Sequence, residues 1–296
     1  MHVVIAGGRG LLGRALAAAL RADGHVVAVL TRRANGPADV SWNPKEGTDA
    51  RWRTIVGTAD AVINLAGESI AGGRWSTARK AKLLESRIDA TRALTVAIVD
   101  APRPPAVFLS ASAIGYYGPH GDEPLTEESP PGADFLARVC HAWEQEAQRA
   151  ANSTRVVALR TGVVLARDGG ALPRMALPFR LFAGGPVGSG RQYVSWIHIA
   201  DWVDQVHWAL TTAGISGAMN LTAPQPVTNR EFASALGHAL RRPSFVPTPA
   251  LALRLALGEM STIVLDGQRV LPARATALGF RFGYPQLEPA LRSLYP

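Results

Sequence analysis

The stretch Gly7-Gly8-Arg9-Gly10-Leu11-Leu12-Gly13 decides the fold of this 296-residue chain. Its glycines satisfy both G-x-x-G-x-x-G, which starts at Gly7, and G-x-G-x-x-G, which starts at Gly8. A dinucleotide-binding turn needs glycine for three reasons: the tight turn, the approach of the backbone to a pyrophosphate, and close packing of helix on strand. The helix that follows offers free N–H groups and a partial positive charge to the phosphates.

The residues on both sides of this loop favour a nucleotide site over an ordinary glycine-rich turn. Residues 2–6 are mostly β-branched and apolar, as in a buried strand, and residues 12–20 place apolar side chains on one face of a helix. Residues 26–30 form a second apolar run, typical of a parallel strand that is buried on both faces. The segment therefore predicts a strand, a phosphate-binding turn, a helix and a second strand.

The same alternation continues along the chain. We expect strands near residues 61–65, 106–110 and 155–160, and long helices over 76–100 and 134–151. This order predicts an α/β fold, namely a Rossmann doubly wound parallel sheet with a smaller C-terminal substrate lobe. We expect a nucleotide-binding domain over 1–165, with late strands interleaved up to about residue 225, and the smaller lobe over 166–296. Shorter helices are expected over 199–210, 229–240 and 248–257.

Composition and charge narrow the classes of function. Hydrophobic residues make up 47% and charged residues 18%, so the chain can bury a large core. The single cysteine, Cys140, has no disulfide partner within the chain. The net charge is +8, but the basic residues are scattered, so we expect no nucleic-acid partner. Met1 leads directly into a strand and no apolar run could span a membrane, so we expect a cytoplasmic protein with no membrane partner.

The end of the second strand favours one nucleotide over the other. It reads Leu30-Thr31-Arg32-Arg33, and no acidic residue follows until Asp39. Sites for NAD usually place Asp or Glu here to accept a hydrogen bond from the ribose 2′-hydroxyl. Arginine instead pairs with phosphate through two parallel hydrogen bonds, so the sequence favours NADP(H) as the cofactor. The alternative is that both arginines are solvated loop residues.

Several longer motifs resemble one known family. They are Asn64-Leu65-Ala66-Gly67-Glu68, Ser110-Ala111-Ser112-Ala113-Ile114-Gly115-Tyr116-Tyr117-Gly118, Leu159-Arg160-Thr161-Gly162-Val163-Val164-Leu165 and Trp196-Ile197-His198-Ile199-Ala200-Asp201. Together with the glycine loop they resemble the atypical extended short-chain dehydrogenase/reductases of the "epimerase family protein" branch, sometimes labelled cell-division inhibitor homologues. That branch carries a small C-terminal domain of unassigned function. The resemblance covers nearly the whole chain.

The resemblance implies a Rossmann domain that binds NADP(H). The implied contacts come from the glycine loop and from the ends of several later strands and one helix. These contacts are Gly7, Arg9, Gly10, Leu11, Leu12, Gly13, Thr31, Arg32, Leu65, Ala66, Gly67, Lys82, Arg87, Ser110 and Val163. By sequence alone, Lys82 and Arg87 would be ordinary charges on a helix surface.

The catalytic residues of the wider superfamily are missing. Its active members use a tyrosine and a lysine four residues later, in which the lysine lowers the tyrosine pKa. This chain has no Tyr-x-x-x-Lys and no lysine after Lys82; Leu136 and Cys140 stand where the pair is expected. Ser112 is the candidate hydrogen-bond donor to substrate, with Ser110 as the alternative. Tyr117, or its neighbour Tyr116, is the candidate proton donor.

Two further residues are candidate substrate contacts. His198 either contacts substrate or is a structural histidine, and Arg180 either binds an anionic substrate or is a solvated surface residue. No third ligand is spaced for a metal, so we expect none.

Two functions remain open from the sequence. The first is an NADP(H)-dependent oxidoreductase or epimerase-like enzyme that acts on an unidentified small carbonyl or nucleotide-sugar substrate. The second is a non-catalytic NADP(H) sensor that has lost the Tyr–Lys pair. We also expect a homodimer, because related enzymes pair the helices expected at 76–100 and 134–151 across a two-fold axis.

Overall fold

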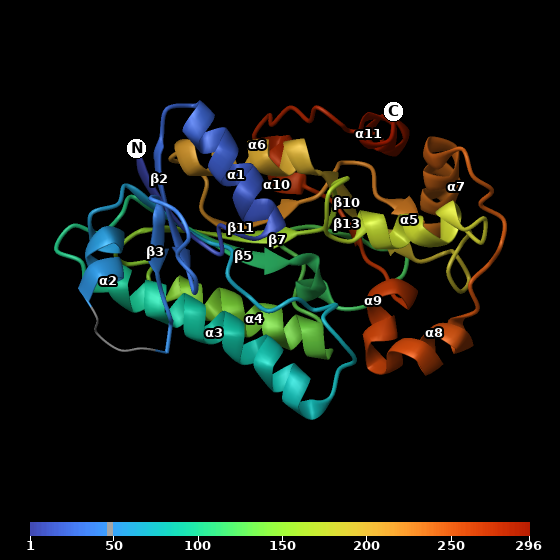
Figure 1. The fold of residues 1–296 in the computed structure, drawn as a ribbon, viewed down its shortest axis with the longest axis horizontal. Coiled ribbons are helices and arrows are strands. Elements are labelled where there is room, and N and C mark those ends of the chain that lie inside the picture. The colour runs from blue at the N-terminus through green and yellow to red at the C-terminus, as the bar shows by residue number, and fades with distance from the viewer. Residues whose placement is uncertain (46–49) are drawn as a thin grey trace.

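A seven-stranded parallel sheet forms the centre of the computed structural model, which describes residues 1–45 and 50–296 (Figure 1). The strands lie in the order β11-β7-β5-β4-β1-β2-β3. Their bounds are β1 His2–Ala6, β2 Val26–Thr31, β3 Asp39–Ser41, β4 Ala61–Asn64, β5 Val107–Ala113, β7 Arg155–Thr161 and β11 Gly217–Leu221. The chain order reverses at β1, and ligands of such sheets bind at the carboxyl ends of the strands beside this switch point.

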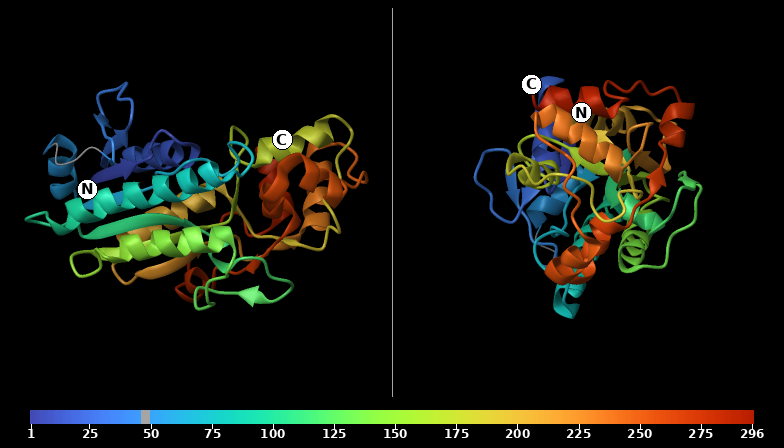
Figure 2. Two further views of the ribbon diagram at one scale, coloured as in Figure 1. Left: turned by 90° about the horizontal axis from the view of Figure 1, so that it is seen from below. Right: turned by 90° about the vertical axis from the view of Figure 1, so that its right-hand side faces the viewer.

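Helices cover both faces of the sheet (Figures 1 and 2). One face carries α1 (Leu11–Ala22) and α6 (Ile199–Thr211), and the other carries α2 (Ala50–Gly57), α3 (Thr77–Val99) and α4 (Phe135–Gln148). Because strand side chains alternate, Val3 and Ile5 join the core under α1 and α6, whereas Val4 and Ala6 join the core under α3. The predicted doubly wound Rossmann fold is confirmed.

Each of the two long helices, α3 and α4, begins directly after a residue whose side chain caps it. Ser76 accepts a hydrogen bond from the backbone N–H of Arg79, and Asp134 accepts one from that of Ala137. Side-chain oxygens in these positions satisfy N–H groups that the first turn leaves free. The helices expected at 76–100 and 134–151 are therefore present within a few residues. Among the strands of the central sheet and the helices that cover it, the short edge strand β3 and helix α2 were not expected from the sequence.

The second half of the chain builds a smaller lobe with a core of its own. Leu165, Leu172, Phe232 and Leu291 are buried together in this core. The elements of the lobe and of the connecting segments follow. They are η1 (Ile114–Tyr117), β6 (Pro124–Leu125), β8 (Val163–Leu165), α5 (Leu172–Arg180), β9 (Tyr193–Val194), β10 (Trp196–His198), β12 (Val227–Thr228), α7 (Asn229–Leu240), α8 (Ala250–Leu257), η2 (Gly258–Ser261), α9 (Thr262–Leu265), β13 (Arg269–Val270), α10 (Ala273–Ala277) and α11 (Leu287–Leu294).

The chain moves between the sheet and the smaller lobe more than once. After β8 and α5 it returns to the sheet through α6 and β11, and only then continues into α7 to α9 (Figure 1). A domain division near residue 165, with interleaved strands after it, stays a prediction. Within the described residues, no helix is both long enough and apolar enough to cross a membrane.

Candidate nucleotide-binding site

The glycine loop lies between β1 and α1, and three of its glycines are required by the packing of the protein itself. Gly7 has a φ of 77°, and a Cβ there would lie 2.7 Å from the carbonyl carbon of Leu65. A Cβ on Gly8 would lie 2.8 Å from a methyl group of Val29, and one on Gly13 would lie 2.5 Å from the Cα of Gly8. These contacts bring the helix, the loop and the neighbouring strands as close together as backbone atoms allow.

Gly10 differs from the other three glycines. It has extended dihedral angles, with φ −70° and ψ 172°, and a Cβ there would contact no atom nearer than 3.4 Å. It is the N-cap of α1, where no side chain caps the helix and no acidic residue lies in the first turn. The first-turn N–H groups thus remain available to an anion, with the partial positive charge of the helix behind them. A side chain at Gly10 would fill this cradle, so the loop fits a pyrophosphate.

The loop after β8 lies against the start of α1. A Cβ on Gly169 or on Gly170 would lie 3.2 Å or 3.1 Å from side-chain atoms of Leu11. Val163 begins β8 and donates its N–H to the carbonyl of Ser195. The structure therefore brings the start of the smaller lobe to the predicted cradle.

A solvent-exposed positive charge follows the end of β2. The side chain of Arg32 is 83% exposed, and Thr31 is half-buried behind it. Asp39 serves another purpose, because its carboxylate pairs with Arg9 and accepts the N–H of Asn35. The hydrogen bond from Arg9 holds the pKa of Asp39 below its usual range. In this arrangement Asp39 closes the loop before β3, and its carboxylate is already engaged by the protein.

The turn after β4 is shaped by Asn64. Its side chain donates to Thr91 Oγ1 at 2.9 Å and accepts the N–H of Ala66 at 3.1 Å, which fixes the turn through Leu65 and Ala66. Gly67 follows, and a Cβ at this position would make an ordinary contact of 3.4 Å with the Arg87 side chain.

Arg87 is a support for this turn. Its guanidinium donates to the carbonyls of Leu83 at 2.8 Å and Glu68 at 3.1 Å, and it lies over the ring of Trp143. Burial lowers its pKa below the usual arginine value. Lys82, also on α3, is 62% exposed and lies 3.8 Å from a carboxylate oxygen of Glu68. Of the two cations implied on this helix, Lys82 is the one that a ligand can reach without displacing internal hydrogen bonds.

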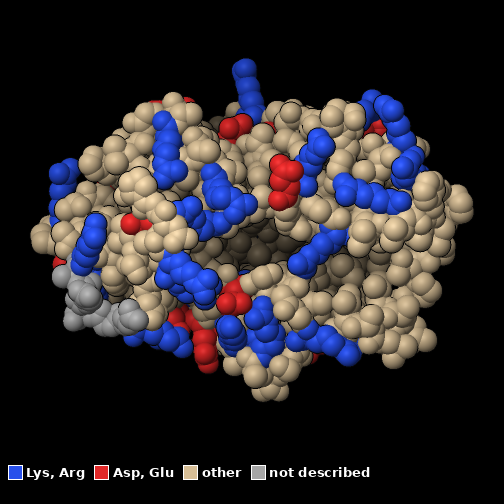
Figure 3. All heavy atoms as spheres, in the orientation of Figure 1, with Lys and Arg blue, Asp and Glu red and all other residues tan. Residues whose placement is uncertain are grey.

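A hollow opens at the centre of the face shown in Figure 3, and Lys and Arg side chains gather on its rim. In the same orientation, the Rossmann sheet lies on one side of it and the smaller lobe on the other (Figure 1). A positively charged rim attracts anionic ligands such as the phosphates of a dinucleotide. The hollow is the candidate site for the nucleotide and for a small substrate beside it.

The end of β5 holds the residues predicted to act on substrate. Ser112 is buried and donates to Glu144 Oε1 at 2.6 Å. Ser110 is also buried, and its hydroxyl has no hydrogen-bond partner among the described residues. Tyr117 is fully buried; its hydroxyl donates to Asn220 Oδ1 at 2.7 Å and accepts from Arg160 at 3.0 Å. Burial, which outweighs the effect of Arg160, raises the pKa of Tyr117 to about 12.

Arg160 joins these groups into one buried network. It makes two hydrogen bonds of 2.9 Å to the carboxylate of Glu144, and its guanidinium lies 3.5 Å from the ring centre of Tyr116. Burial opposes the charge of Arg160, but the bonds to Glu144 outweigh it and raise the pKa of the guanidinium. Glu127 receives the N–H groups of Asn220 and Arg274, which extends the network to the C-terminal segment. The network holds Ser112 and Tyr117 in place, and it uses the hydroxyl protons of both side chains.

The positions of the missing Tyr–Lys pair are occupied by apolar contacts. A Cβ on Gly115, in η1, would lie 3.3 Å from Leu136 Cβ and 3.8 Å from Cys140 Sγ, so both α4 residues face the end of β5. Burial raises the pKa of the Cys140 thiol to about 12. Neither side chain can exchange a proton near neutral pH. The catalytic roles of Ser112 and Tyr117 stay predictions. In the structure, the hydroxyls of both residues form hydrogen bonds with other side chains of the protein.

His198 and Arg180 lie at structural positions. His198 is buried, and its Nδ1 accepts the N–H of Ala200 at the start of α6. The centre of its ring lies 3.9 Å from that of Tyr284, with the two rings tilted by 34°. Arg180, at the end of α5, is exposed and lies over the ring of Tyr295. For His198 these contacts match the structural alternative, and burial lowers its pKa. A substrate role for either residue stays a prediction.

Two groups of contacts in the site were not predicted from the sequence. The pairing of Glu144 with Arg160 was not predicted, because nothing in their separation of sixteen residues shows that α4 and β7 bring them together. Glu68 ends one of the motifs quoted above, and its ion pairs with Arg32, Arg79 and Lys82 were not predicted from the sequence.

Two family models and several known proteins match this chain. The model of the NAD dependent epimerase/dehydratase family matches residues 3–221, and a domain of unknown function, DUF1731, matches residues 248–294. The epimerase family protein SDR39U1 homolog, chloroplastic, of Arabidopsis thaliana is 43% identical over 99% of this chain and 86% of its own length. The epimerase family protein SDR39U1 of Mus musculus is 39% identical, over 99% of both chains.

A solved structure is similar over the whole chain. The crystal structure of human epimerase family protein SDR39U1 (isoform2) with NADPH has a TM-score of 0.93 and 37% identity, and the match covers 100% of this chain and 99% of that one. UDP-glucose 4-epimerase of Thermus thermophilus, at 17% identity and a TM-score of 0.75, shares the fold. The glycine cradle, the family model and these relatives lead to one conclusion: this chain belongs to the NAD dependent epimerase/dehydratase family, in the extended short-chain dehydrogenase/reductase group that carries DUF1731.

Proposed function

We propose that this protein binds NADP(H) across the carboxyl ends of β1, β2 and β4, with the pyrophosphate at the start of α1 and the adenosine 2′-phosphate at Arg32. The observation that carries the proposal is the open cradle at Gly10, which protein packing alone does not require. The exposed Arg32 and Lys82 supply charge for the phosphate. A relative that was solved with NADPH supports the phosphorylated form.

A second, small ligand would bind in the hollow beside the cradle (Figure 3). NADPH would supply a hydride there to the carbonyl carbon of an acceptor, either a small carbonyl compound or the keto form of a nucleotide sugar, and the resulting alkoxide would take a proton from solvent as the product leaves. The protein would orient the acceptor and exclude water, while Ser112 and Glu144 hold the end of β5 rigid. We therefore propose an NADP(H)-dependent oxidoreductase or epimerase-like activity that proceeds without the Tyr–Lys pair.

One observation favours a second function, that of a non-catalytic NADP(H) sensor. The hydroxyl of Tyr117 is buried between Asn220 and Arg160, and that of Ser112 is bound to Glu144, so the expected proton-transfer groups are already engaged. A sensor needs the cradle and no general acid.

Hydride transfer separates the two functions. The purified protein is mixed with NADPH and a panel of carbonyl compounds, and NADPH oxidation is followed by absorbance. In a second series it is mixed with NADP⁺ and nucleotide sugars, and the epimerised sugar is detected by chromatography, because an epimerase returns the hydride and causes no net oxidation. An oxidoreductase oxidises NADPH with at least one acceptor, at a rate about 10²–10⁴-fold below that of a tuned acid–base site. If NADPH binds but no acceptor is reduced and no sugar is epimerised, the result supports the sensor function. If NADPH does not bind, both functions fail.

A further inference from the structure

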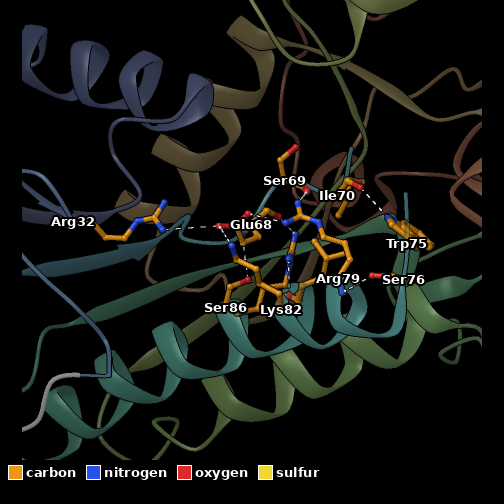
Figure 4. A network of polar contacts seen from close by, with 11 residues as sticks. Arg32, Glu68, Ser69, Ile70, Trp75, Ser76, Arg79, Lys82 and Ser86 are labelled. Atoms are coloured by element: carbon orange, nitrogen blue, oxygen red, sulfur yellow. Dashed lines mark hydrogen bonds and ion pairs between the residues drawn. The ribbon is translucent and has the colours of Figure 1, made fainter. Parts of the chain in front are cut away.

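Glu68 lies at the centre of a group of three positive charges (Figure 4). Its carboxylate is 3.1 Å from Arg79, 3.8 Å from Lys82 and 3.9 Å from Arg32. The three cations come from two places, the end of β2 and the first turns of α3. Residues that are far apart in the sequence thus meet at one carboxylate, directly after the turn that follows β4.

The backbone of Glu68 is fixed independently of its carboxylate. Its N–H donates to Ser86 Oγ at 3.1 Å, and its carbonyl accepts from Arg87 at 3.1 Å. The carboxylate can therefore be changed without releasing the turn.

The three cations are held with different strength. Arg79 is hydrogen-bonded to Glu68, also donates to the carbonyl of Ser69, and is only 17% exposed. Arg32 and Lys82 are 83% and 62% exposed, and they approach Glu68 at distances too long for a hydrogen bond. Exposed pairs of this kind contribute little to stability. Arg32 and Lys82 are therefore free to turn to another anion.

The charge of the group matches that of a phosphate monoester. Three cations and one carboxylate give a net charge of +2, and a phosphate monoester carries about −1.5 to −2 at pH 7. Burial raises the pKa of Glu68, but the hydrogen bond from Arg79 and the charges of Lys82 and Arg32 outweigh it, so the carboxylate is ionised at neutral pH.

We infer that Glu68 is an internal counter-ion that competes with the 2′-phosphate of NADP(H) for Arg32 and Lys82, and so lowers the affinity for the phosphorylated nucleotide. The inference rests on the proposed function. Glu68 also repels the phosphate directly, because both groups are negative and share the same cations. NADH has no 2′-phosphate, so its affinity does not depend on this competition. Glu68 would make NADP(H) exchange readily.

The test compares Glu68→Gln with the matched control Glu85→Gln, which removes the same charge from an exposed position on α3. Affinities of both variants and of the wild type for NADPH and NADH are measured by calorimetry at constant, low salt. We expect Glu68→Gln to bind NADPH about 3- to 10-fold more tightly, with an NADH affinity within about twofold of the wild type. The control should change neither affinity.

A second variant tests the cations and keeps the inference falsifiable if Glu68→Gln folds poorly. Lys82→Gln should weaken NADPH binding by a similar factor and leave NADH binding unchanged. A wild type that prefers NADPH, together with a Glu68→Gln variant that binds NADPH equally or more weakly, would overturn the inference and leave the proposed function standing. An effect of Glu68→Gln that is equal for both nucleotides would also overturn it. A wild type that binds neither nucleotide overturns the proposed function and this inference together.

Discussion

At the scale of single residues, the site differs most from the sequence prediction at the end of β5. The motif with Ser112 and Tyr117 was expected to contain the proton-transfer groups, and it forms the end of β5 and the turn η1. Its hydroxyls, however, are bonded to Glu144, Asn220 and Arg160. A buried tyrosine that keeps its proton up to a pKa of about 12 is a poor acid or base near neutral pH.

The pH dependence of any turnover tests this point. Burial keeps Tyr117 protonated, so at about pH 9 fewer than roughly one in a hundred of these side chains would be ionised. We expect the rate of NADPH oxidation between about pH 7 and pH 10 to follow the same profile in the wild type and in Tyr117→Phe. A rise of the rate toward high pH that disappears in Tyr117→Phe would show that tyrosinate is the base after all.

The same residue gives a prediction for stability. Tyr117→Phe removes the hydrogen-bond partner of Asn220 Oδ1 and one partner of Arg160, and both residues are buried. Leaving buried polar groups unpaired costs about 1–3 kcal/mol. We expect denaturant unfolding to show a loss of this size, whereas Tyr193→Phe, whose ring lies in the smaller lobe, should lose less. Equal stability of the wild type and Tyr117→Phe would contradict the network described for Arg160.

At the scale of elements, local patterns predicted most of the sheet and the long helices. Ser76 and Asp134 mark helix starts because a capping hydroxyl or carboxylate acts within three residues of its own position. Strand β3 and helix α2 were missed because each is short, and they are held by Trp42 and Trp52, which pack on each other from different segments. The Arg160 network could not be predicted either, since it depends on side chains that only the fold brings together.

The glycine loop offers a matched pair of variants at this scale. Gly13→Ala would force a Cβ to 2.5 Å from a backbone atom, and such overpacking costs about 1–3 kcal/mol. Gly10→Ala meets only an ordinary contact at 3.4 Å and should lose less stability than Gly13→Ala, with a small cost because alanine is a poorer N-cap than glycine. Its methyl group would instead occupy the cradle and weaken NADPH binding by roughly tenfold or more.

Thermal unfolding and calorimetry check both halves of this prediction. If Gly10→Ala bound NADPH as well as the wild type does, the start of α1 would not be the pyrophosphate site. If Gly13→Ala were as stable as the wild type, the close approach of α1 to the loop would be wrong.

At the scale of the whole molecule, the sheet and the smaller lobe lie on opposite sides of the charged hollow (Figures 1 and 3). On the face of the sheet opposite α1 and α6, the helices α3 and α4 lie side by side (Figure 2). Val96 and Val99 of α3 are 40% and 45% exposed. Exposed apolar residues on a long helix are suitable for association. This is the surface on which the expected dimer would form.

We propose that two copies pair through α3 and α4 as a four-helix bundle. Light scattering at tens of micromolar protein should then report about twice the chain mass of 31.4 kDa. Val96→Glu should shift the particle toward the monomer, because it places a charge on the paired surface. A wild-type particle of one chain mass at that concentration would reject the dimer.

Binding of the phosphorylated nucleotide is tested by a single titration experiment. NADPH and NADH are titrated into the wild type, into Arg32→Ala and into the control Arg33→Ala, which removes the adjacent arginine. A charge-assisted hydrogen bond contributes about 1.5–3 kcal/mol, so the wild type should bind NADPH roughly tenfold or more tightly than NADH. Arg32→Ala should lose most of that preference, and Arg33→Ala should keep it. Equal affinity of the wild type for the two nucleotides would contradict the account.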